Sequence, residues 1–238
     1  GMVYKGKLSD GENLLRWAQA GTEFRHSRLF RFFCIFFPGL NLLFLALGIA
    51  DILSFNWLTG SFILCLLVSI GLQKKITLFQ ISYEDKLAIL GSYIRQMKLM
   101  ETLHPESEVL KACCMRLNNG KEPASTAIAQ LSKEMNALNQ RNILAYIVLN
   151  GFLFWEVRQV MRIEQWKERH AASLPTWLDA IGEMDALCSL ATFAYNHPDY
   201  TWPVPTEQPF TFCADRMGHP LIHRDRCVRN GIRMEKRP

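Results

Sequence analysis

Two long apolar runs near the N-terminus most constrain what this chain can fold into. Residues 32–50 and residues 52–73 contain no charged side chain, and only Asp51 separates them. An α-helix rises about 1.5 Å per residue, so a run of about 20 residues crosses the roughly 30 Å hydrocarbon core of a bilayer. The runs therefore predict a hydrophobic helical hairpin that is inserted in a membrane, with its connection within residues 51–59.

The charges that flank the two runs predict an orientation. Arginines precede the first run and lysines follow the second, namely Arg25, Arg28, Arg31, Lys74 and Lys75. The connection between the runs has neither residue type. Because short loops rich in Lys and Arg stay on the cytoplasmic side, both ends of the hairpin are expected there. This predicts a protein at the cytoplasmic face of the inner membrane.

A buried hairpin in a soluble, cytoplasmic protein is the alternative. Residues 38–39 (Pro-Gly) and the polar Ser54, Asn56, Ser61 and Ser69 interrupt the apolar runs and keep that alternative open. Nearly half of the residues (49%) are hydrophobic, which is enough for a sizeable core. Seven cysteines without regular spacing indicate a reducing setting, and the net charge of +5 is compatible with phosphate or acidic lipid.

The remainder of the first 200 residues has helical periodicity. Residues 10–20 predict a short docking helix, and residues 74–103 predict an amphipathic helix that continues the hairpin. A shorter helix is expected over residues 106–117. From Pro123 the pattern continues to about residue 171, which is a rod on the order of 70 Å if it is unbroken. Within it, residues 143–155 are apolar all round, and we expect them at the buried centre of a helical body.

The chain changes character after residue 196. Pro198 ends the preceding helix because proline lacks an N–H and restricts the residue before it. Further prolines force an extended path, residues 210–213 predict a short strand, and residues 218–220 (Gly-His-Pro) predict a turn. The expected fold is all-α, with long antiparallel lever-like helices, a hydrophobic helical hairpin and a short extended or β C-terminal tail.

Residues 183–230 resemble the MutS family of DNA mismatch repair ATPases, at the junction between the lever helices and the ATPase domain. The whole of about Arg141 to Asn230 fits the pattern of that family, and the part upstream fits by architecture rather than by motif. The likeness is greatest to the membrane-associated, MutS-like proteins of bacteria. It rests on Glu183, Ala186, Leu187, residues 189–191 (Ser-Leu-Ala), residues 193–195 (Phe-Ala-Tyr), residues 196–200 (Asn-His-Pro-Asp-Tyr), Pro203, residues 218–222 (Gly-His-Pro-Leu-Ile) and residues 227–230 (Cys-Val-Arg-Asn).

The resemblance implies a mechanical role. It divides the chain into an N-terminal helical segment (1–28), the hydrophobic hairpin (29–73), a core and lever domain (74–200) and the beginning of a truncated ATPase domain (201–238). The lever would couple ATP-driven motion of the ATPase domain of the same parent chain to DNA or to a membrane. A homodimer is a further expected partner. The alternative is a helical membrane scaffold or interaction module without mismatch repair activity.

The nucleotide chemistry of this family is expected beyond residue 238. No GxxxxGK[ST] loop occurs here, so this chain is not expected to be an enzyme or to bind ATP and magnesium alone. The resemblance implies that Cys227, Val228 and Asn230 lie beside the adenine pocket of the parent protein. Cys227 stands where the family commonly has an aromatic residue that stacks on the base.

The resemblance also implies contact with the DNA backbone near the far end of the lever. Cations around residues 118–123 are the candidates, namely Lys111, Arg116, Lys121 and Lys133, because backbone contact needs Lys and Arg without strict sequence reading. We predict no metal site, since the spacing of Cys213, His219, His223 and Cys227 fits no standard zinc site. No arrangement of nucleophile and base predicts a catalytic residue.

Overall fold

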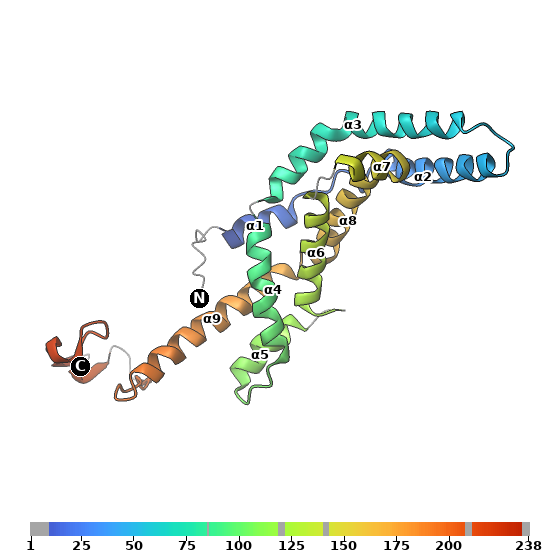
Figure 1. Cartoon of the computed structure of the whole chain (residues 1–238). Coiled ribbons are helices and arrows are strands. Elements are labelled where there is room, and N and C mark those ends of the chain that lie inside the picture. Colours follow the sequence, from blue (N-terminus) through green and yellow to red (C-terminus); the bar gives the residue numbers. More distant parts are fainter. Residues whose placement is uncertain (1–9, 85, 119–121, 140–142, 208–210, 235–238) are drawn as a thin grey trace. The chain divides into compact units, whose positions relative to one another are not determined.

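The computed structural model describes residues 10–84, 86–118, 122–139, 143–207 and 211–234 (Figure 1). Its contacts divide the chain into two compact units, Gly1–Ser189 and Leu190–Pro238. The boundary between these units falls inside the last long helix. The prediction of an all-α fold with a short β tail is confirmed, because the described residues form helices up to Asn196 and a small antiparallel sheet after it.

The larger unit contains helices of very different composition. They are α1 (Asp10–Gln19), α2 (Arg28–Ile49), α3 (Asn56–Glu84), α4 (Leu87–Thr102), α5 (Glu108–Leu117), α6 (Ala124–Asn139), α7 (Ile143–Leu153), α8 (Trp155–His170) and the first part of α9 (Leu174–Asn196). The mean hydropathy is highest in α2, α3 and α7, which lie together at one end of this unit (Figure 1).

The predicted hydrophobic hairpin is present as α2 and α3. The side chain of Ser27 caps α2 by accepting the N–H of Phe30 at 3.5 Å. Residues 50–55 connect the two helices, and Asp51 takes a left-handed conformation there (φ 59°). Residues 56–59, which were expected in the connection, already belong to α3.

Two of the predicted long helices are divided. The pattern over residues 74–103 was expected to form one helix with the second apolar run, but α3 ends at Glu84 and α4 begins at Leu87. The predicted unbroken rod over residues 124–171 consists of α6, α7 and α8. Apolar spacing of three and four residues continues across these breaks, so periodicity alone gives no sign of them.

The position predicted for residues 143–155 was wrong. Helix α7 does not lie at the centre of the helical body but packs against α2 and α3 as a third apolar helix (Figure 1). Phe154 causes the break, because its left-handed backbone (φ 53°, ψ 45°) ends α7 and redirects the chain into α8. This conformation costs on the order of 1–2 kcal/mol for a residue with a Cβ. The buried Phe154 ring packs on Phe33 and Phe37 of α2, which offsets that cost.

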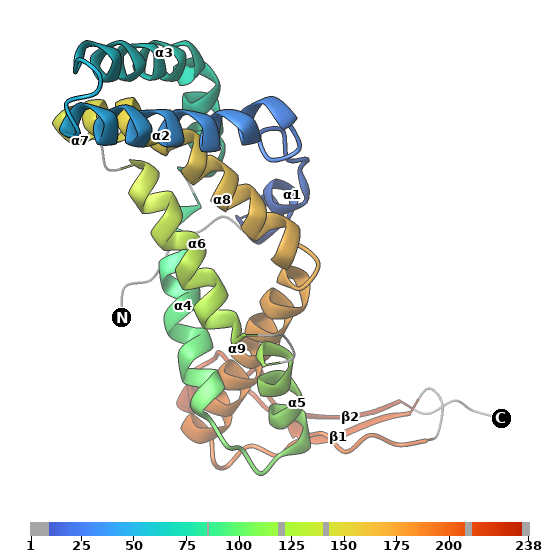
Figure 2. The ribbon, with the colours of Figure 1, turned by 90° about the vertical axis from the view of Figure 1, so that its right-hand side faces the viewer.

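The helical body consists of α4, α6 and α8. Helix α6 packs against both α4 and α8, and its direction is opposite to that of α8 (Figure 2). Its buried apolar face includes Ile128, Leu131, Met135 and Leu138, at the spacing of an amphipathic helix. The antiparallel pair that was expected, an unbroken rod over residues 124–171 with the helix after it, differs from this pair, because α6 and α8 both come from the predicted rod.

The smaller unit begins within α9. Pro198 follows the end of this helix as predicted, and Phe193, His197 and Tyr200 form a ring cluster there, with the His197 and Tyr200 ring centroids 4.6 Å apart. Further on, β1 (Phe212–Met217) pairs antiparallel with β2 (Asn230–Met234). A bulge interrupts the pairing near Arg216, which has a positive φ of 51°.

The substitution Gly151→Ala tests the packing of α7 against α3. A Cβ added at Gly151 would overlap the ring of Phe62 on α3, so Gly151→Ala should force α7 away from α3 and destabilise the protein by about 1–3 kcal/mol. Gly91→Ala in α4 is the matched control, because nothing lies within 4 Å of the added Cβ. It should stabilise by about 0.5–1 kcal/mol through helix propensity. Denaturant titration in detergent measures both, and an equal response of the two variants would contradict this packing.

Candidate functional site

Exposed large apolar side chains are most numerous on α2 and α3 among the described residues. Both helices are long and apolar enough to cross a membrane. Length and composition do not separate a spanning helix from the core helix of a soluble protein, so burial has to decide. Only 28% of the most apolar window of α2 and 17% of that of α3 is buried. Side chains such as Ile35, Leu42, Leu64 and Leu67 are at least half exposed.

Polar side chains of α2 and α3 provide hydrogen bonds for the last carbonyl groups of α7. We call α2, α3 and α7 the apolar unit. Asn41 of α2 donates its amide N–H groups to the carbonyls of Gly151 (2.9 Å) and Phe152 (3.1 Å). Ser61 of α3 donates its hydroxyl to Asn41 Oδ1 at 2.7 Å, which fixes the orientation of the amide. The last carbonyls of a helix lack intrahelical partners, and they need such partners wherever water is excluded.

Asn150 makes a second set of contacts at the same break. Its side-chain Oδ1 accepts the N–H of Glu156 at 3.0 Å, so it satisfies the first turn of α8. Its backbone carbonyl accepts the thiol of Cys65 on α3 at 3.0 Å. Asn41 and Asn150 together join α2, α3, α7 and α8 at one point.

The base of the hairpin is held by α1. Trp17 is buried, its indole N–H donates to Ser82 Oγ on α3 at 3.1 Å, and its ring meets Tyr83 edge-on. Lys167 of α8 lies over the same ring, with Nζ 4.9 Å from the ring centroid. Burial lowers the pKa of Lys167, and the nearby Glu164 carboxylate opposes that shift.

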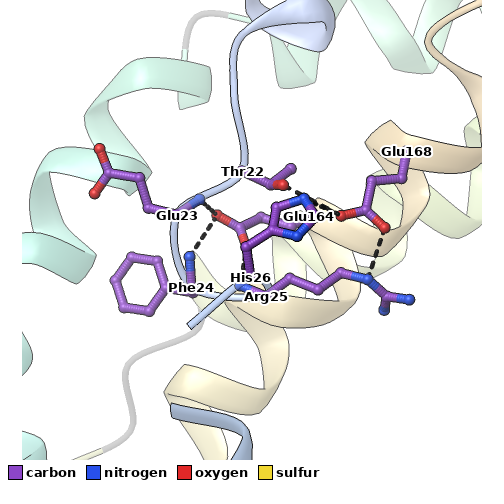
Figure 3. A network of polar contacts seen from close by, with 7 residues as sticks. All are labelled: Thr22, Glu23, Phe24, Arg25, His26, Glu164 and Glu168. Atoms are coloured by element: carbon purple, nitrogen blue, oxygen red, sulfur yellow. Dashed lines mark hydrogen bonds and ion pairs between the residues drawn. The ribbon is translucent and has the colours of Figure 1, made fainter. Parts of the chain in front are cut away.

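Glu164 of α8 binds the backbone of the segment between α1 and α2 (Figure 3). Its Oε1 accepts the N–H groups of Glu23 (2.9 Å) and Phe24 (3.2 Å), and its Oε2 accepts the N–H of Arg25 (2.6 Å). The carboxylate is only 2% exposed, so these three charge-assisted hydrogen bonds replace its hydration.

Glu168 adds a more exposed layer one helical turn later. Its carboxylate lies 2.7 Å from Arg25 Nε and 3.4 Å from His26 Nε2, and it accepts the Thr22 hydroxyl at 3.2 Å. We call residues 22–26, Glu164 and Glu168 the basal joint (Figure 3). The joint ties the segment that enters α2 to the middle of α8.

The described cations predicted to contact DNA do not form one cluster. Lys111 and Arg116 lie on α5, where they pair with Glu108 (2.7 Å) and with Glu183 of α9 (2.6 Å). Lys133 is exposed on α6. Lys121 falls outside the described residues. The two ion pairs lower the positive potential that α5 offers to a phosphate.

The residues predicted beside a nucleotide lie around the small β-hairpin. Cys227 Sγ packs against Gly218 in the predicted turn, Val228 is exposed, and Asn230 pairs with Met217. None of the three lines the cavities of about 350 and 790 Å³ found in the described part of the chain. Nor does any group of three metal-ligating side chains come together among the described residues.

The basal joint was not found from the sequence. Glu164 occupies a position four residues after Val160 on the packing face of α8, so a carboxylate among buried apolar residues was the available signal. Asn41 and Asn150 gave a similar signal inside apolar runs. The backbone groups that Glu164 and Asn41 bind lie more than a hundred residues away along the chain, and spacing cannot identify them.

No protein-family model, curated protein or solved structure matches this chain. The comparisons therefore assign no family. The resemblance to the MutS family stays a prediction that rests on residues 183–230.

Glu164→Gln tests the basal joint. The amide has a single acceptor oxygen and no charge, so it cannot replace a carboxylate that accepts three N–H groups. We expect a loss of about 2–3 kcal/mol in the free energy of unfolding, and faster hydrogen exchange at Glu23, Phe24 and Arg25. The control is Glu168→Gln, whose partly exposed ion pairs should contribute about 1 kcal/mol or less. Equal losses, or unchanged exchange at residues 23–25, would refute the assignment.

Proposed function

We propose that this chain is a membrane-anchored helical lever, in which the α2–α3 hairpin and α7 lie in the lipid bilayer and the helical body transmits motion to them. The exposed apolar surface of α2 and α3 is the single observation that carries the membrane anchor. Water is a poor solvent for exposed apolar side chains in such number, and hydrocarbon is a good one.

The charges favour the bilayer over a protein partner. Arg28 and Arg31 stand in the first turn of α2, and Lys74 and Lys75 follow the apolar part of α3, so the cations gather at one end of the hairpin. The connection at the other end has Asp51 as its charged residue and contains no Lys or Arg. This asymmetry supports a cytoplasmic base and an external tip.

The lever function rests on the MutS-like residues of α9 and of the segment after it. In this proposal, an ATPase domain of the parent chain moves α9, and α8 carries the motion through the basal joint to the hairpin. Cys227, Val228 and Asn230 would border the nucleotide of that domain, which would supply ATP and magnesium chemistry. A strand followed by GxxxxGK[ST] in the coding sequence after residue 238 is the expected observation, and its absence would favour a membrane scaffold.

Flotation with lipid vesicles tests the anchor. The chain should float with vesicles that contain anionic phospholipid and should resist extraction at alkaline pH. Leu42→Lys combined with Leu64→Lys adds about 5 kcal/mol to the cost of insertion, so the floated fraction should fall about tenfold or more. Leu99→Lys in α4 is the matched control, because Leu99 is similarly exposed but lies outside the hairpin. A chain that stays monodisperse in buffer without detergent would overturn the anchor.

Salt-dependent binding of duplex DNA tests the proposed contact with a DNA backbone. Contact of the four predicted cations with DNA phosphates would release only a few counterions from the DNA. A plot of the logarithm of the binding constant against the logarithm of the salt concentration should therefore have a slope no steeper than about −4. Lys133→Gln should reduce the magnitude of that slope by about 1, since Lys133 is exposed on α6. Lys98→Gln on α4 is the control and should leave the slope unchanged. No binding at low salt would remove DNA as a partner and favour the scaffold alternative.

A further inference from the structure

A polar cavity lies between α6 and α8, and neither the anchor nor the basal joint uses it. Its volume is about 350 Å³. We call it the α6–α8 groove. The polar side chains that line it are Gln130 and Glu134 from α6, and Arg162, Gln165, Arg169 and His170 from α8.

Basic side chains outnumber carboxylates in the lining. Arg162 and Arg169 are both exposed, and Glu134 is the only carboxylate among the lining residues. Arg162 Nη1 is 3.7 Å from Glu134 Oε2, which is longer than a good hydrogen bond. The Gln159 amide, in the orientation that satisfies its neighbours, donates to the same Oε2 and accepts the Trp155 indole N–H. Glu134 is thus engaged from within the protein, and the guanidinium of Arg162 keeps donors for a ligand.

His170 forms a fixed end wall of the groove. Its ring lies between the rings of Trp166 (5.1 Å) and Trp177 (5.7 Å), and its Nε2 is 3.2 Å from Glu122 Oε1. Burial lowers the pKa of His170, an effect that Glu122 opposes and Arg169 reinforces. The lowered pKa favours the neutral imidazole, and the two guanidinium groups of Arg162 and Arg169 are the permanent positive charges of the lining.

We propose that the α6–α8 groove binds a small ligand that carries a diphosphate or two phosphate groups, held by Arg162 and Arg169. These arginines are seven residues apart on one face of α8, which separates them by about 10 Å along the helix axis. Their side chains are long enough to reach one ligand from both positions. Guanidinium groups bind phosphate oxygens in bidentate fashion. A ligand with a single carboxylate would pair with only one of the two guanidinium groups, whereas a ligand with two phosphate groups would pair with both. The amides of Gln130 and Gln165 add donors, and the volume accommodates one small molecule.

Arg158 distinguishes between a small ligand and a nucleic acid as the molecule that the groove binds. It lies on the same face of α8, four residues before Arg162, and it is exposed but does not line the groove. An extended phosphodiester backbone along α8 would contact all three arginines. A small ligand in the groove needs Arg162 and Arg169 and leaves Arg158 in solvent.

Calorimetric titration with inorganic pyrophosphate tests the proposal, using the full chain in a maltoside detergent at pH 7.5. We expect saturable binding at one site, weakened about tenfold or more by Arg162→Gln and by Arg169→Gln. The matched control Arg158→Gln should bind within about twofold of the original chain. Because all three side chains are exposed, each variant should keep its circular dichroism spectrum and elution volume.

Several results would overturn the proposal. One is the absence of saturable pyrophosphate binding by the folded chain, and another is unchanged binding by both Arg162→Gln and Arg169→Gln. An equal loss in Arg158→Gln would indicate a diffuse basic surface instead of a site. If a DNA duplex binds and Arg158→Gln weakens that binding as much as Arg162→Gln does, while pyrophosphate does not compete, the groove is part of a nucleic-acid surface and not a small-ligand site.

Discussion

The carbonyls at the end of α7 are the constraint on which the apolar unit depends. A helix that ends among apolar side chains leaves acceptors that water cannot reach, and each one left without a donor would cost several kcal/mol. Asn41 supplies donors to two of them. With these acceptors satisfied, the chain can change direction at Phe154 while its ring stays packed on α2. The body helices can then begin directly beneath the hairpin, in contact with it.

Helix α8 is consequently attached to the hairpin at two levels. Its first turn is held by Asn150 and by the packing of Phe154 on α2, and its middle is held by Glu164 and Glu168. One of these attachments is mostly apolar and the other consists of hydrogen bonds to a charged group. Two separated attachments resist rotation as well as translation, so α8 and the base of α2 are expected to move as one piece.

The parts of the fold that local chemistry determines could be predicted. Charge-free runs predicted α2 and most of α3, Pro198 predicted the end of α9, amphipathic spacing predicted α5, and Pro123 predicted the start of α6. The break at Phe154 could not be predicted, because a left-handed phenylalanine is locally unfavourable and persists through rings on α2 that are far away in sequence. The basal joint could not be predicted for the same reason, because Glu164 binds the backbone of residues 23–25, which are far away in sequence. Of the residues predicted from the resemblance, Arg116 pairs with Glu183 of α9, which spacing could not reveal, whereas the pair of Lys111 with Glu108 three residues earlier follows from helical spacing.

The connection between α2 and α3 has a consequence for biosynthesis. It spans only residues 50–55, and Asp51 is its one charged residue. In the proposed orientation, a hairpin inserted with this tip outward would carry a single carboxylate across the bilayer, while α1, α4, α5, α6, α8 and α9 would remain on the side where they are synthesised. Such an insertion would require no translocation of a folded domain. In the proposed arrangement, the two apolar helices would enter the bilayer as a pair, and α7 would pack against that pair.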